Sequence, residues 1–299
     1  MINITVVIVT YNTPEKIIID CLKSIDKNVK ILIIENSENF FHKKIILSQF
    51  QNVEILCTGS NLGYGAGNNF GINAVKTDYV LILNPDVICH DNFFTNINKI
   101  IGDNNNFSII GCQYMHDKIF MPAGFFDKSK NKEFRKKFEN NQINELHKVD
   151  WVTGCSMLIN LKKFENKKIF DENFFLYFEE FDLCKSLIRK DENVYTSKML
   201  KIHHLGFKSS FEDDSLKKKK LNRVREWHWM WSTFYFYKKN NNYFYALYMV
   251  IGKFIKAFIK IIFYSITFQK NQKEKYKYRF LGILNAILGK SSYYRDDTK

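Results

Sequence analysis

A short apolar run followed by a segment of helical spacing recurs along the first 90 residues of the chain. The apolar runs are rich in β-branched residues and cover residues 4–10, 29–34, 53–56 and 79–83. After the first run, Pro14 suits the first turn of a helix, and apolar residues recur at helical spacing as far as Ile25. Strands that are apolar throughout are buried on both faces of a parallel sheet. The pattern predicts an α/β fold with an open sheet, whose ligands bind beyond the carboxyl ends of its strands.

Each apolar run ends in a polar cluster. These clusters are Tyr11-Asn12-Thr13, Glu35-Asn36-Ser37, the Gly- and Asn-rich stretch 61–69, and Asn84-Pro85-Asp86. The glycines at positions 63, 65 and 67 differ from the dinucleotide-binding spacing G-x-G-x-x-G, and they follow the third strand instead of the first. We expect stretch 61–69 to be a loop that lets the backbone approach a phosphorylated ligand; the alternative is a flexible turn that binds nothing.

Asp86 is a candidate ligand for a hard divalent cation, because it closes a buried strand at the expected ligand crevice. A cation that bridges a diphosphate needs only one or two protein carboxylates, since phosphate oxygens and water complete its shell. The alternative is an Asx-type turn that ends the strand. Farther along, His203 and His204 follow another short apolar stretch. Either histidine is a candidate metal ligand, and the alternative is a structural role.

An acidic cluster follows the aromatic run that ends at Phe178. Its carboxylates are Glu179, Glu180 and Asp182. A carboxylate placed against aromatic rings tends to have a raised pKa, which suits a general base. The alternative is the solvated first turn of a helix, where acidic residues are common.

The composition restricts the class of protein and its compartment. The formal charge of +14 favours an anionic partner, which could be nucleic acid, anionic lipid or a phosphorylated small molecule. The six cysteines are scattered without a CxxC pair, so the sequence predicts neither a zinc site nor a disulfide framework. The chain starts directly with a strand-like run and shows no secretory leader, so we expect a cytoplasmic protein.

The character of the sequence changes after residue 208. A basic cluster at residues 217–225 is followed by the tryptophan-rich stretch 226–231, and residues 245–268 are apolar except for three lysines at helical spacing. Charges in the middle of the segment disfavour a transmembrane helix. We expect an amphipathic helix in the headgroup region of an anionic membrane; the alternative is a helix that packs on the catalytic domain.

The ordered motifs resemble those of family 2 glycosyltransferases with the GT-A fold, in particular the rhamnosyltransferase-like branch. The matching motifs are VVIVTYN ending at Asn12, IIENS ending at Ser37, NLGYGAGNN at 61–69, LNPD ending at Asp86, GCSMLI at 154–159, FEEFDL at 178–183 and the histidine pair. The resemblance covers residues 3–208. It implies a Rossmann-like open mixed sheet with helices on both faces, here a catalytic domain at 1–208 with a connecting segment at 209–240 and amphipathic helices at 241–299.

The resemblance also implies roles for individual residues. The positions that hold the nucleoside in the family are Thr10, Tyr11, Asn12 and Glu35, where most members have Asp in place of Glu35. The positions that line the donor site are Asn61, Gly65 and Asn68. Asp86 matches the last residue of the DxD-type metal motif, and Asn84 stands in place of its first acid. His204 aligns with a histidine that completes the metal site, with His203 adjacent.

In the acidic motif, Glu180 takes the place of the catalytic base, which is usually Asp, Asp182 closes the motif, and Glu179 precedes it. The resemblance implies an inverting, Mg²⁺- or Mn²⁺-dependent transferase that uses a nucleotide diphosphate sugar, with dTDP-rhamnose favoured and UDP or GDP sugars next. The acceptor would be a surface polysaccharide or lipid-linked glycan. We expect a peripheral protein at the inner face of the bacterial cytoplasmic membrane that binds no nucleic acid. Two rivals are an inactive glycosyltransferase-like scaffold and a nucleic-acid-binding protein that uses the basic and aromatic segment.

Overall fold

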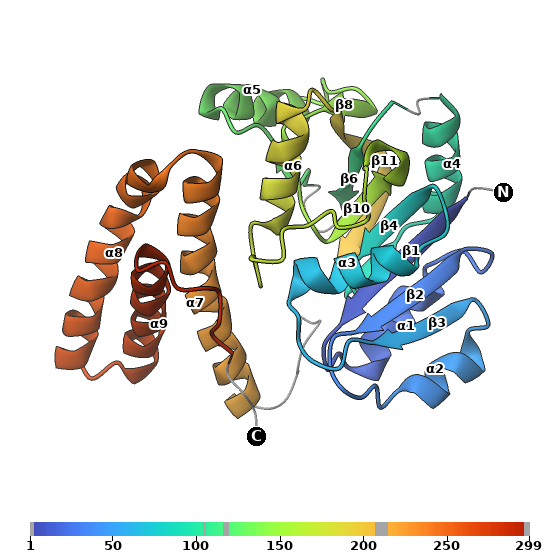
Figure 1. The fold of residues 1–299 in the computed structure, drawn as a ribbon. Helices are drawn as coiled ribbons and strands as arrows, with labels where there is room; N and C mark the ends of the chain where they lie inside the picture. Colours follow the sequence, from blue (N-terminus) through green and yellow to red (C-terminus); the bar gives the residue numbers. More distant parts are fainter. Residues whose placement is uncertain (1–2, 104–105, 116–119, 207–214, 296–299) are drawn as a thin grey trace. The chain divides into compact units, whose positions relative to one another are not determined.

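The computed structural model describes residues 3–103, 106–115, 120–206 and 215–295 (Figure 1). The chain forms two compact units. Unit 1 takes in the described residues within 1–62, 66–170 and 183–210, and unit 2 those within 63–65, 171–182 and 211–299.

The main sheet of unit 1 has the strand order β3-β2-β1-β4-β10-β6-β11-β5, with β8 paired to β11. Its strands are β1 Ile4–Thr10, β2 Lys30–Glu35, β3 Val53–Cys57, β4 Tyr79–Leu83, β5 Val87–Cys89, β6 Ile109–Tyr114, β8 Leu146–Lys148, β10 Ser156–Asn160 and β11 Val194–His204. A small second sheet pairs β7 Ala123–Gly124 with β9 Trp151–Val152. Strands β3, β2, β1 and β4 are parallel neighbours, whereas β10 runs antiparallel to β4 and β6. The sheet is therefore open and mixed.

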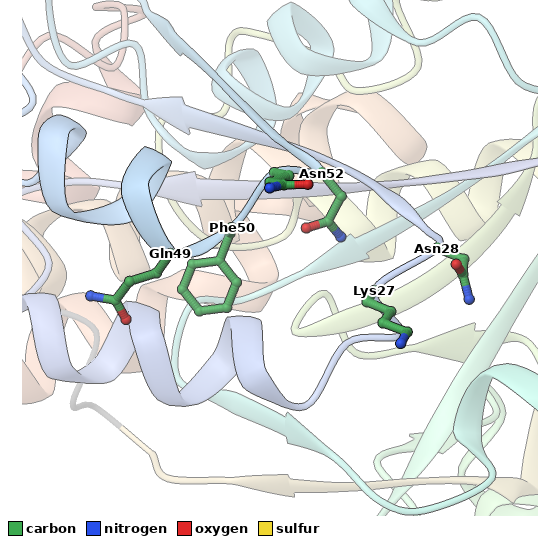
Figure 2. A pocket seen from close by; sticks show the side chains of 6 residues that line it. Lys27, Asn28, Gln49, Phe50 and Asn52 are labelled. Atoms are coloured by element: carbon green, nitrogen blue, oxygen red, sulfur yellow. The ribbon is translucent and has the colours of Figure 1, made fainter.

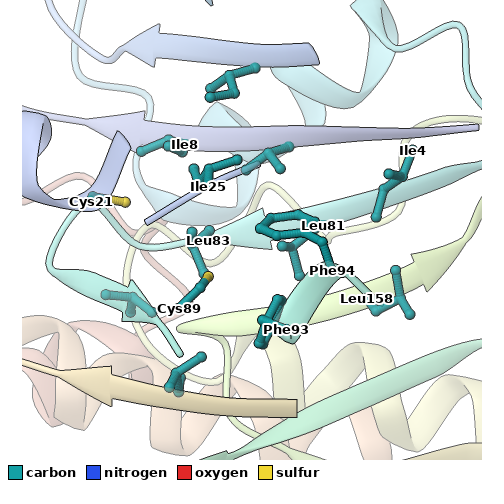
Figure 3. Close-up of a cluster of buried hydrophobic side chains, with 14 of the residues drawn as sticks. Ile4, Ile8, Cys21, Ile25, Leu81, Leu83, Cys89, Phe93, Phe94 and Leu158 are labelled. Atoms are coloured by element: carbon teal, nitrogen blue, oxygen red, sulfur yellow. The ribbon is translucent and has the colours of Figure 1, made fainter. Parts of the chain in front are cut away.

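Helices cover both faces of this sheet. The helices are α1 Glu15–Lys23, α2 Lys43–Gln49, α3 Tyr64–Ala74, α4 Phe93–Asp103, α5 Lys128–Glu139, the 3₁₀ helix η1 Leu161–Lys163 and α6 Glu179–Arg189, of which α3 and α6 begin in unit 2. Side chains of α1 and α4 join a core cluster with alternate residues of the strands, including Ile8, Cys21 and Phe93 (Figure 3). Helix α3 lies on the opposite face, where Gly71 approaches Val7 and Ile34. Because successive strand residues point to opposite faces, the continuous apolar runs bury both sides.

The predicted strands agree with the structure to within one residue at each end. The expected loop at 61–69 is wrong for most of its length, because helix α3 begins at Tyr64. The glycines serve two other purposes there. Gly63 has φ of +91°, a conformation that L side chains rarely adopt. A Cβ at Gly67 would lie 3.0 Å from Val9 Cγ1, so a larger residue would push the helix away from the sheet.

Unit 2 is built mainly from the helices α7 Ser215–Asn240, α8 Tyr243–Ile266 and α9 Lys270–Ile287. Trp227, Trp231 and Phe234 of α7 form a buried cluster with Val250 of α8 and Ile283 of α9. Residues 215–240, which the sequence suggested to be a connecting segment, thus form one helix with a buried aromatic face. The predicted boundary at 208/209 lies outside the described residues. Within the described ranges, no helix has the length and apolar content that crossing a membrane requires.

Candidate active site

Glu35, the last residue of β2, connects the carboxyl ends of β1 and β2 by hydrogen bonds. Thr10 lies opposite Glu35 in the parallel register, and its hydroxyl donates a hydrogen bond to Glu35 Oε2 at 2.6 Å. Glu35 Oε1 accepts hydrogen bonds from the Ser37 hydroxyl at 2.6 Å and from the Asn12 backbone N–H at 3.3 Å. Glu35 is buried, and this network uses both of its carboxylate oxygens. The hydrogen bond from Asn12 ties Glu35 to the loop after β1, where Asn12 has φ of +49°.

A second network connects β2 to the start of α3. Asn36 Oδ1 accepts hydrogen bonds from the Leu62 backbone N–H at 3.0 Å and from the Thr58 hydroxyl at 3.1 Å. Asn36 Nδ2 donates to Asn61 Oδ1 at 3.2 Å. Asn68, the fifth residue of α3, is fully buried, and Gly65 is the second residue of that helix. These residues of unit 1 therefore lie at the carboxyl edge of the sheet, and their role in binding a donor stays a prediction.

Asn84, Pro85 and Asp86 form a turn between β4 and β5. The Val87 backbone N–H donates to the Asn84 carbonyl at 3.2 Å, and the Asn84 N–H donates to the Cys155 carbonyl at 2.8 Å. The turn that the sequence offered as an alternative is therefore present, but it also buries Asp86, whose exposed fraction is 1%. Burial and the nearby Asp86 carboxylate raise the pKa of Cys21, so this thiol stays protonated beneath the turn.

The pairing of β11 with β5 brings His204 to Asp86. His204 lies opposite Val87 in the antiparallel register, and its Nε2 is 3.4 Å from Asp86 Oδ1. The Leu205 backbone N–H also donates to the Asp86 carbonyl at 2.9 Å. His203 is directed elsewhere, because neighbouring strand residues point to opposite faces. Its Nδ1 donates to the Met115 carbonyl at 2.8 Å. The structure thus distinguishes the two histidines that the sequence left open.

The pair formed by Asp86 and His204 suits a divalent cation that is shared with a ligand. Asp86 Oδ1 is buried and, within the described residues, accepts no hydrogen bond. A buried carboxylate oxygen without a donor is costly, and a bound cation would relieve that cost. The described residues contain no group of three or more His, Cys, Asp and Glu that could hold a metal ion. The pair would therefore need oxygens from a diphosphate and from water to complete a coordination shell.

A surface hollow near the start of the chain lies at the wrong edge of the sheet to be a donor site. Figure 2 shows its lining residues, which include Lys27, Phe50 and Asn52. These residues directly precede β2 and β3, so the hollow lies at the amino ends of the strands. Ligands of open α/β sheets bind at the carboxyl ends. We therefore assign no function to this hollow.

In unit 2, the residues before the acidic cluster have an unusual backbone conformation. Tyr177 and Phe178 have φ values of +71° and +72°, the left-handed region that bulky side chains rarely occupy. Such residues cost on the order of 1–3 kcal/mol each and persist only where tertiary contacts hold them. Glu179 follows directly and is 2% exposed, with an Oε1 that accepts no hydrogen bond in the described part of the chain. Burial, together with the charge of Glu180, raises the pKa of Glu179 well above its usual range.

Asp182 is held by two residues near the end of α7 that the sequence did not suggest. Lys239 Nζ lies 2.6 Å from Asp182 Oδ2 and 2.7 Å from Asp171 Oδ2. Asn240 Nδ2 donates to Asp182 Oδ1 at 2.9 Å. Both carboxylate oxygens of Asp182 are therefore occupied inside unit 2. Lys239 belongs to a Lys-Lys-Asn-Asn run with no recognisable motif, so its partners become evident only from the structure.

Comparisons with known proteins agree with this arrangement. The profile of "Glycosyl transferase family 2" matches residues 5–167, more than half of the chain. Rhamnosyltransferase WbbL of Escherichia coli K12 is 27% identical over 190 residues, which cover 58% of this chain and 71% of WbbL. The low-salt glycan biosynthesis hexosyltransferase Agl10 of Haloferax volcanii is 23% identical over 209 residues, and the match covers 64% of each protein.

A solved structure shares the fold. The crystal structure of GalNAc-T7 with UDP, GalNAc and Mn²⁺ superposes with a TM-score of 0.56 at 14% identity. The match covers 79% of this chain and 50% of the GalNAc-T7 chain. This confirms the predicted mixed α/β architecture of the GT-A type, to which this chain adds the C-terminal helices.

Proposed function

Because the chain belongs to glycosyl transferase family 2, we propose that it moves a sugar from a nucleotide diphosphate donor to a glycan or lipid-linked glycan, with inversion at the anomeric carbon. The observation that carries this proposal is the buried Asp86 carboxylate beside His204, at the edge of the sheet where Thr10 and Asn12 also lie. A pyrophosphate bound there would lie between the proposed cation site at Asp86 and the polar residues that follow β1.

The donor that we favour is dTDP-rhamnose, with UDP and GDP sugars as the next candidates. Support comes from the rhamnosyltransferase named among the relatives, while the hexosyltransferase Agl10 keeps other hexoses in consideration. We propose that Asn61, Gly65 and Asn68, with Thr10, Tyr11, Asn12 and Glu35, bind this donor. Since the network around Glu35 already uses both carboxylate oxygens, Glu35 would act mainly by shaping the loop that holds the nucleoside.

Asp86 and His204 would hold Mg²⁺ or Mn²⁺ on the donor diphosphate. The cation would supply positive charge to the oxygens of the departing diphosphate. Asn84 contributes its backbone N–H and carbonyl to the turn that fixes Asp86. The protein's own part is to keep the carboxylate buried and oriented, so that little reorganisation is required when the donor binds.

Glu180 is the best candidate for the general base among the three acidic residues. Burial and the charge of Glu180 raise the pKa of Glu179 well above its usual range, and its side chain is almost completely buried, which disfavours contact with an acceptor. Asp182 is committed to Lys239 and Asn240 and would position the start of α6. Glu180 is half-buried, in contrast to Glu179 and Asp182, which are buried. In the reaction, it would take the proton of an acceptor hydroxyl as that oxygen bonds to the anomeric carbon. The bond from that carbon to the nucleoside diphosphate breaks at the same time.

The test is turnover of a panel of dTDP-, UDP- and GDP-sugars by the purified full chain, with and without EDTA. We expect EDTA to abolish release of the nucleoside diphosphate and added Mn²⁺ or Mg²⁺ to restore it. Asp86→Asn should remove the metal response, whereas Asp91→Asn, at an exposed position nearby, should retain it. Glu180→Gln should bind donor normally and lose transfer. If no donor is turned over or protects the protein against heat, the chain is a scaffold and the proposal is wrong.

The outward face of α8 supports the expectation that the chain binds a membrane surface. One continuous stripe of this helix carries large apolar side chains, each at least 40% exposed. We call it the α8 stripe: Phe244, Tyr248, Ile251, Ile255, Ile259, Ile262 and Ile266. Their spacing of three or four residues keeps them on one side of the helix, opposite Ala246, Val250 and Ala257, which are buried. Contiguous exposed apolar surface of this kind marks an interaction site.

The distribution of charge supports an anionic lipid surface as the partner of the α8 stripe. Residues 209–299 contain 19 Lys and Arg against 7 Asp and Glu, so +12 of the total charge of +14 lies in this part of the chain. Lys253, Lys256 and Lys260 recur at helical spacing on other sides of α8, away from the α8 stripe. Anionic lipids attract each nearby cation by about 1 kcal/mol. An interfacial helix combines an apolar face with basic residues on its other sides, so we propose peripheral binding at the inner leaflet of the bacterial membrane.

Vesicle flotation of the full chain tests the membrane proposal. We expect flotation with vesicles that contain phosphatidylglycerol and much less with pure phosphatidylcholine. The double variant Ile255→Glu and Ile259→Glu should stay at the bottom of the gradient. The double variant Ile45→Glu and Leu47→Glu places the same two charges at exposed apolar positions of α2 and should float like the wild type. Flotation that is equal for both variants would contradict the assignment of the α8 stripe.

A further inference from the structure

Helix α7 uses two faces for two different tasks within unit 2. The face with Trp227, Trp231 and Phe234 is buried against α8 and α9. The other face contacts residues 171–182, the segment that carries the acidic cluster. Its contacting side chains are Trp229, Ser232, Phe236, Lys239 and Asn240. Four of these five follow the spacing of three or four residues that defines one side of a helix.

Most side chains of this second face are buried, but its first residue, Trp229, is exposed to solvent. Ser232 is buried and donates its hydroxyl to the Leu176 carbonyl at 2.9 Å, and Phe236 packs on Phe178 with ring centroids 5.2 Å apart. Trp229 is instead 42% exposed, although Trp227 and Trp231 of the same helix are 1% and 4% exposed. Trp229 therefore presents part of its indole ring to solvent at the edge of the contact between α7 and residues 176–178.

The exposed indole forms a corner with the strained segment. The ring of Tyr177 stands at 82° to Trp229, with centroids 5.2 Å apart, and Phe178 contacts Trp229 at 5.6 Å. Tyr177 and Phe178 are the two residues with left-handed backbone conformation. Strain of this type is retained at sites where it is part of the mechanism. Here it places the Tyr177 ring against Trp229 immediately before Glu179 and Glu180.

Charged groups surround this corner. Burial raises the pKa of Tyr177 to about 12. The positive charge of Arg225 lowers this pKa, and the negative charges of Glu226 and Glu179 raise it. The phenol therefore keeps its proton and can donate a hydrogen bond to a ligand hydroxyl. A flat aromatic face, a phenolic donor and nearby ionic groups are the features that bind a sugar ring, whose C–H face is apolar and whose rim is polar.

We infer that Trp229 and Tyr177 form a saccharide subsite that holds the acceptor sugar beside the acidic cluster of α6. The inference rests on the proposed transferase function, and it identifies the acceptor as a pyranose that stacks on Trp229. The subsite belongs to unit 2, so the C-terminal helices contribute acceptor recognition in addition to their binding to lipid.

Transfer to soluble methyl glycosides of glucose, galactose, N-acetylglucosamine and rhamnose tests the subsite without a membrane. Trp229→Ala should raise the acceptor KM by roughly tenfold, with donor KM and donor hydrolysis in the absence of acceptor unchanged. Trp229→Phe should recover much of this loss because it keeps a flat ring. Phe41→Ala, which removes an exposed aromatic ring from a position outside the proposed sites, should leave the acceptor KM as in the wild type.

Tryptophan fluorescence gives a reading that does not depend on turnover. Titration of the wild type with the preferred methyl glycoside should change the emission, and Trp229→Phe should abolish that change. The subsite is refuted if the acceptor KM of Trp229→Ala equals that of the wild type, if donor hydrolysis falls in parallel with transfer, or if no glycoside alters the fluorescence. Absence of any donor turnover in the wild type refutes the transferase function instead, and the titration then still decides whether the subsite exists.

Discussion

Replacement of Glu179 by Gln should stabilise the protein at neutral pH and leave transfer intact. Burial and the charge of Glu180 raise the pKa of Glu179 in the folded chain, whereas in the unfolded chain it is close to the ordinary value of 4.5. A carboxyl whose folded pKa is raised favours folding fully below pH 4.5, and this contribution is lost as pH rises toward the folded pKa. Between pH 4.5 and 7 the loss is at most roughly 3 kcal/mol, at 1.36 kcal/mol per pH unit.

Glutamine cannot ionise, so the variant avoids this loss. We expect Glu179→Gln to match the wild type near pH 4.5 and to exceed it by up to about 3 kcal/mol at pH 7, measured by urea unfolding with tryptophan emission. Transfer should persist, because the amide replaces a protonated carboxyl of the same shape. Glu180→Gln should lose transfer and reduce only part of the pH dependence, since burial of Glu179 remains. Unfolding free energies that fall with pH equally in Glu179→Gln and in the wild type would refute the reasoning.

Three further predictions address the supports of the site. Lys239→Met should lower the unfolding free energy by roughly 2 kcal/mol, less than for a fully buried pair because Lys239 is 37% exposed, while Lys238→Met should change it little. Gly71→Val should lower the unfolding free energy by about 1–3 kcal/mol through overpacking, because a Cβ there would lie 2.6 Å from Val7 Cγ1. Gly102→Val is the control, since a Cβ at Gly102 has no neighbour within 4 Å, and thermal unfolding compares the two variants. His204→Ala should raise the Mn²⁺ concentration needed for donor turnover, and an unchanged requirement would exclude it as a ligand.

The sequence alone was sufficient for the first half of the sheet. The runs at 4–10, 29–34, 53–56 and 79–83 are local patterns, and a fully apolar run permits only a strand that is buried on both faces. The polar clusters at their ends therefore fall at the carboxyl edge of the sheet, where open α/β sheets bind their ligands. The same logic failed for stretch 61–69. Glycine indicates either a loop or a close approach of a helix, and only the neighbouring Val9 identifies the second case.

The choice between chemically similar neighbours was made by tertiary structure. His203 and His204 are equivalent in sequence, and strand alternation in β11 directs only one of them to Asp86. Glu179 and Glu180 are likewise equivalent in sequence, but burial makes them chemically different.

The sequence by itself determined the first four strands, the family, and the acidic, histidine and Asn-Pro-Asp motifs. These features depend on residue types that lie close together in the chain. Only the tertiary structure decided that Lys239 fixes Asp182, that Trp229 remains exposed and that α8 turns its apolar stripe outward. Contacts between residues more than fifty positions apart leave no local pattern, since either partner is ordinary without the other.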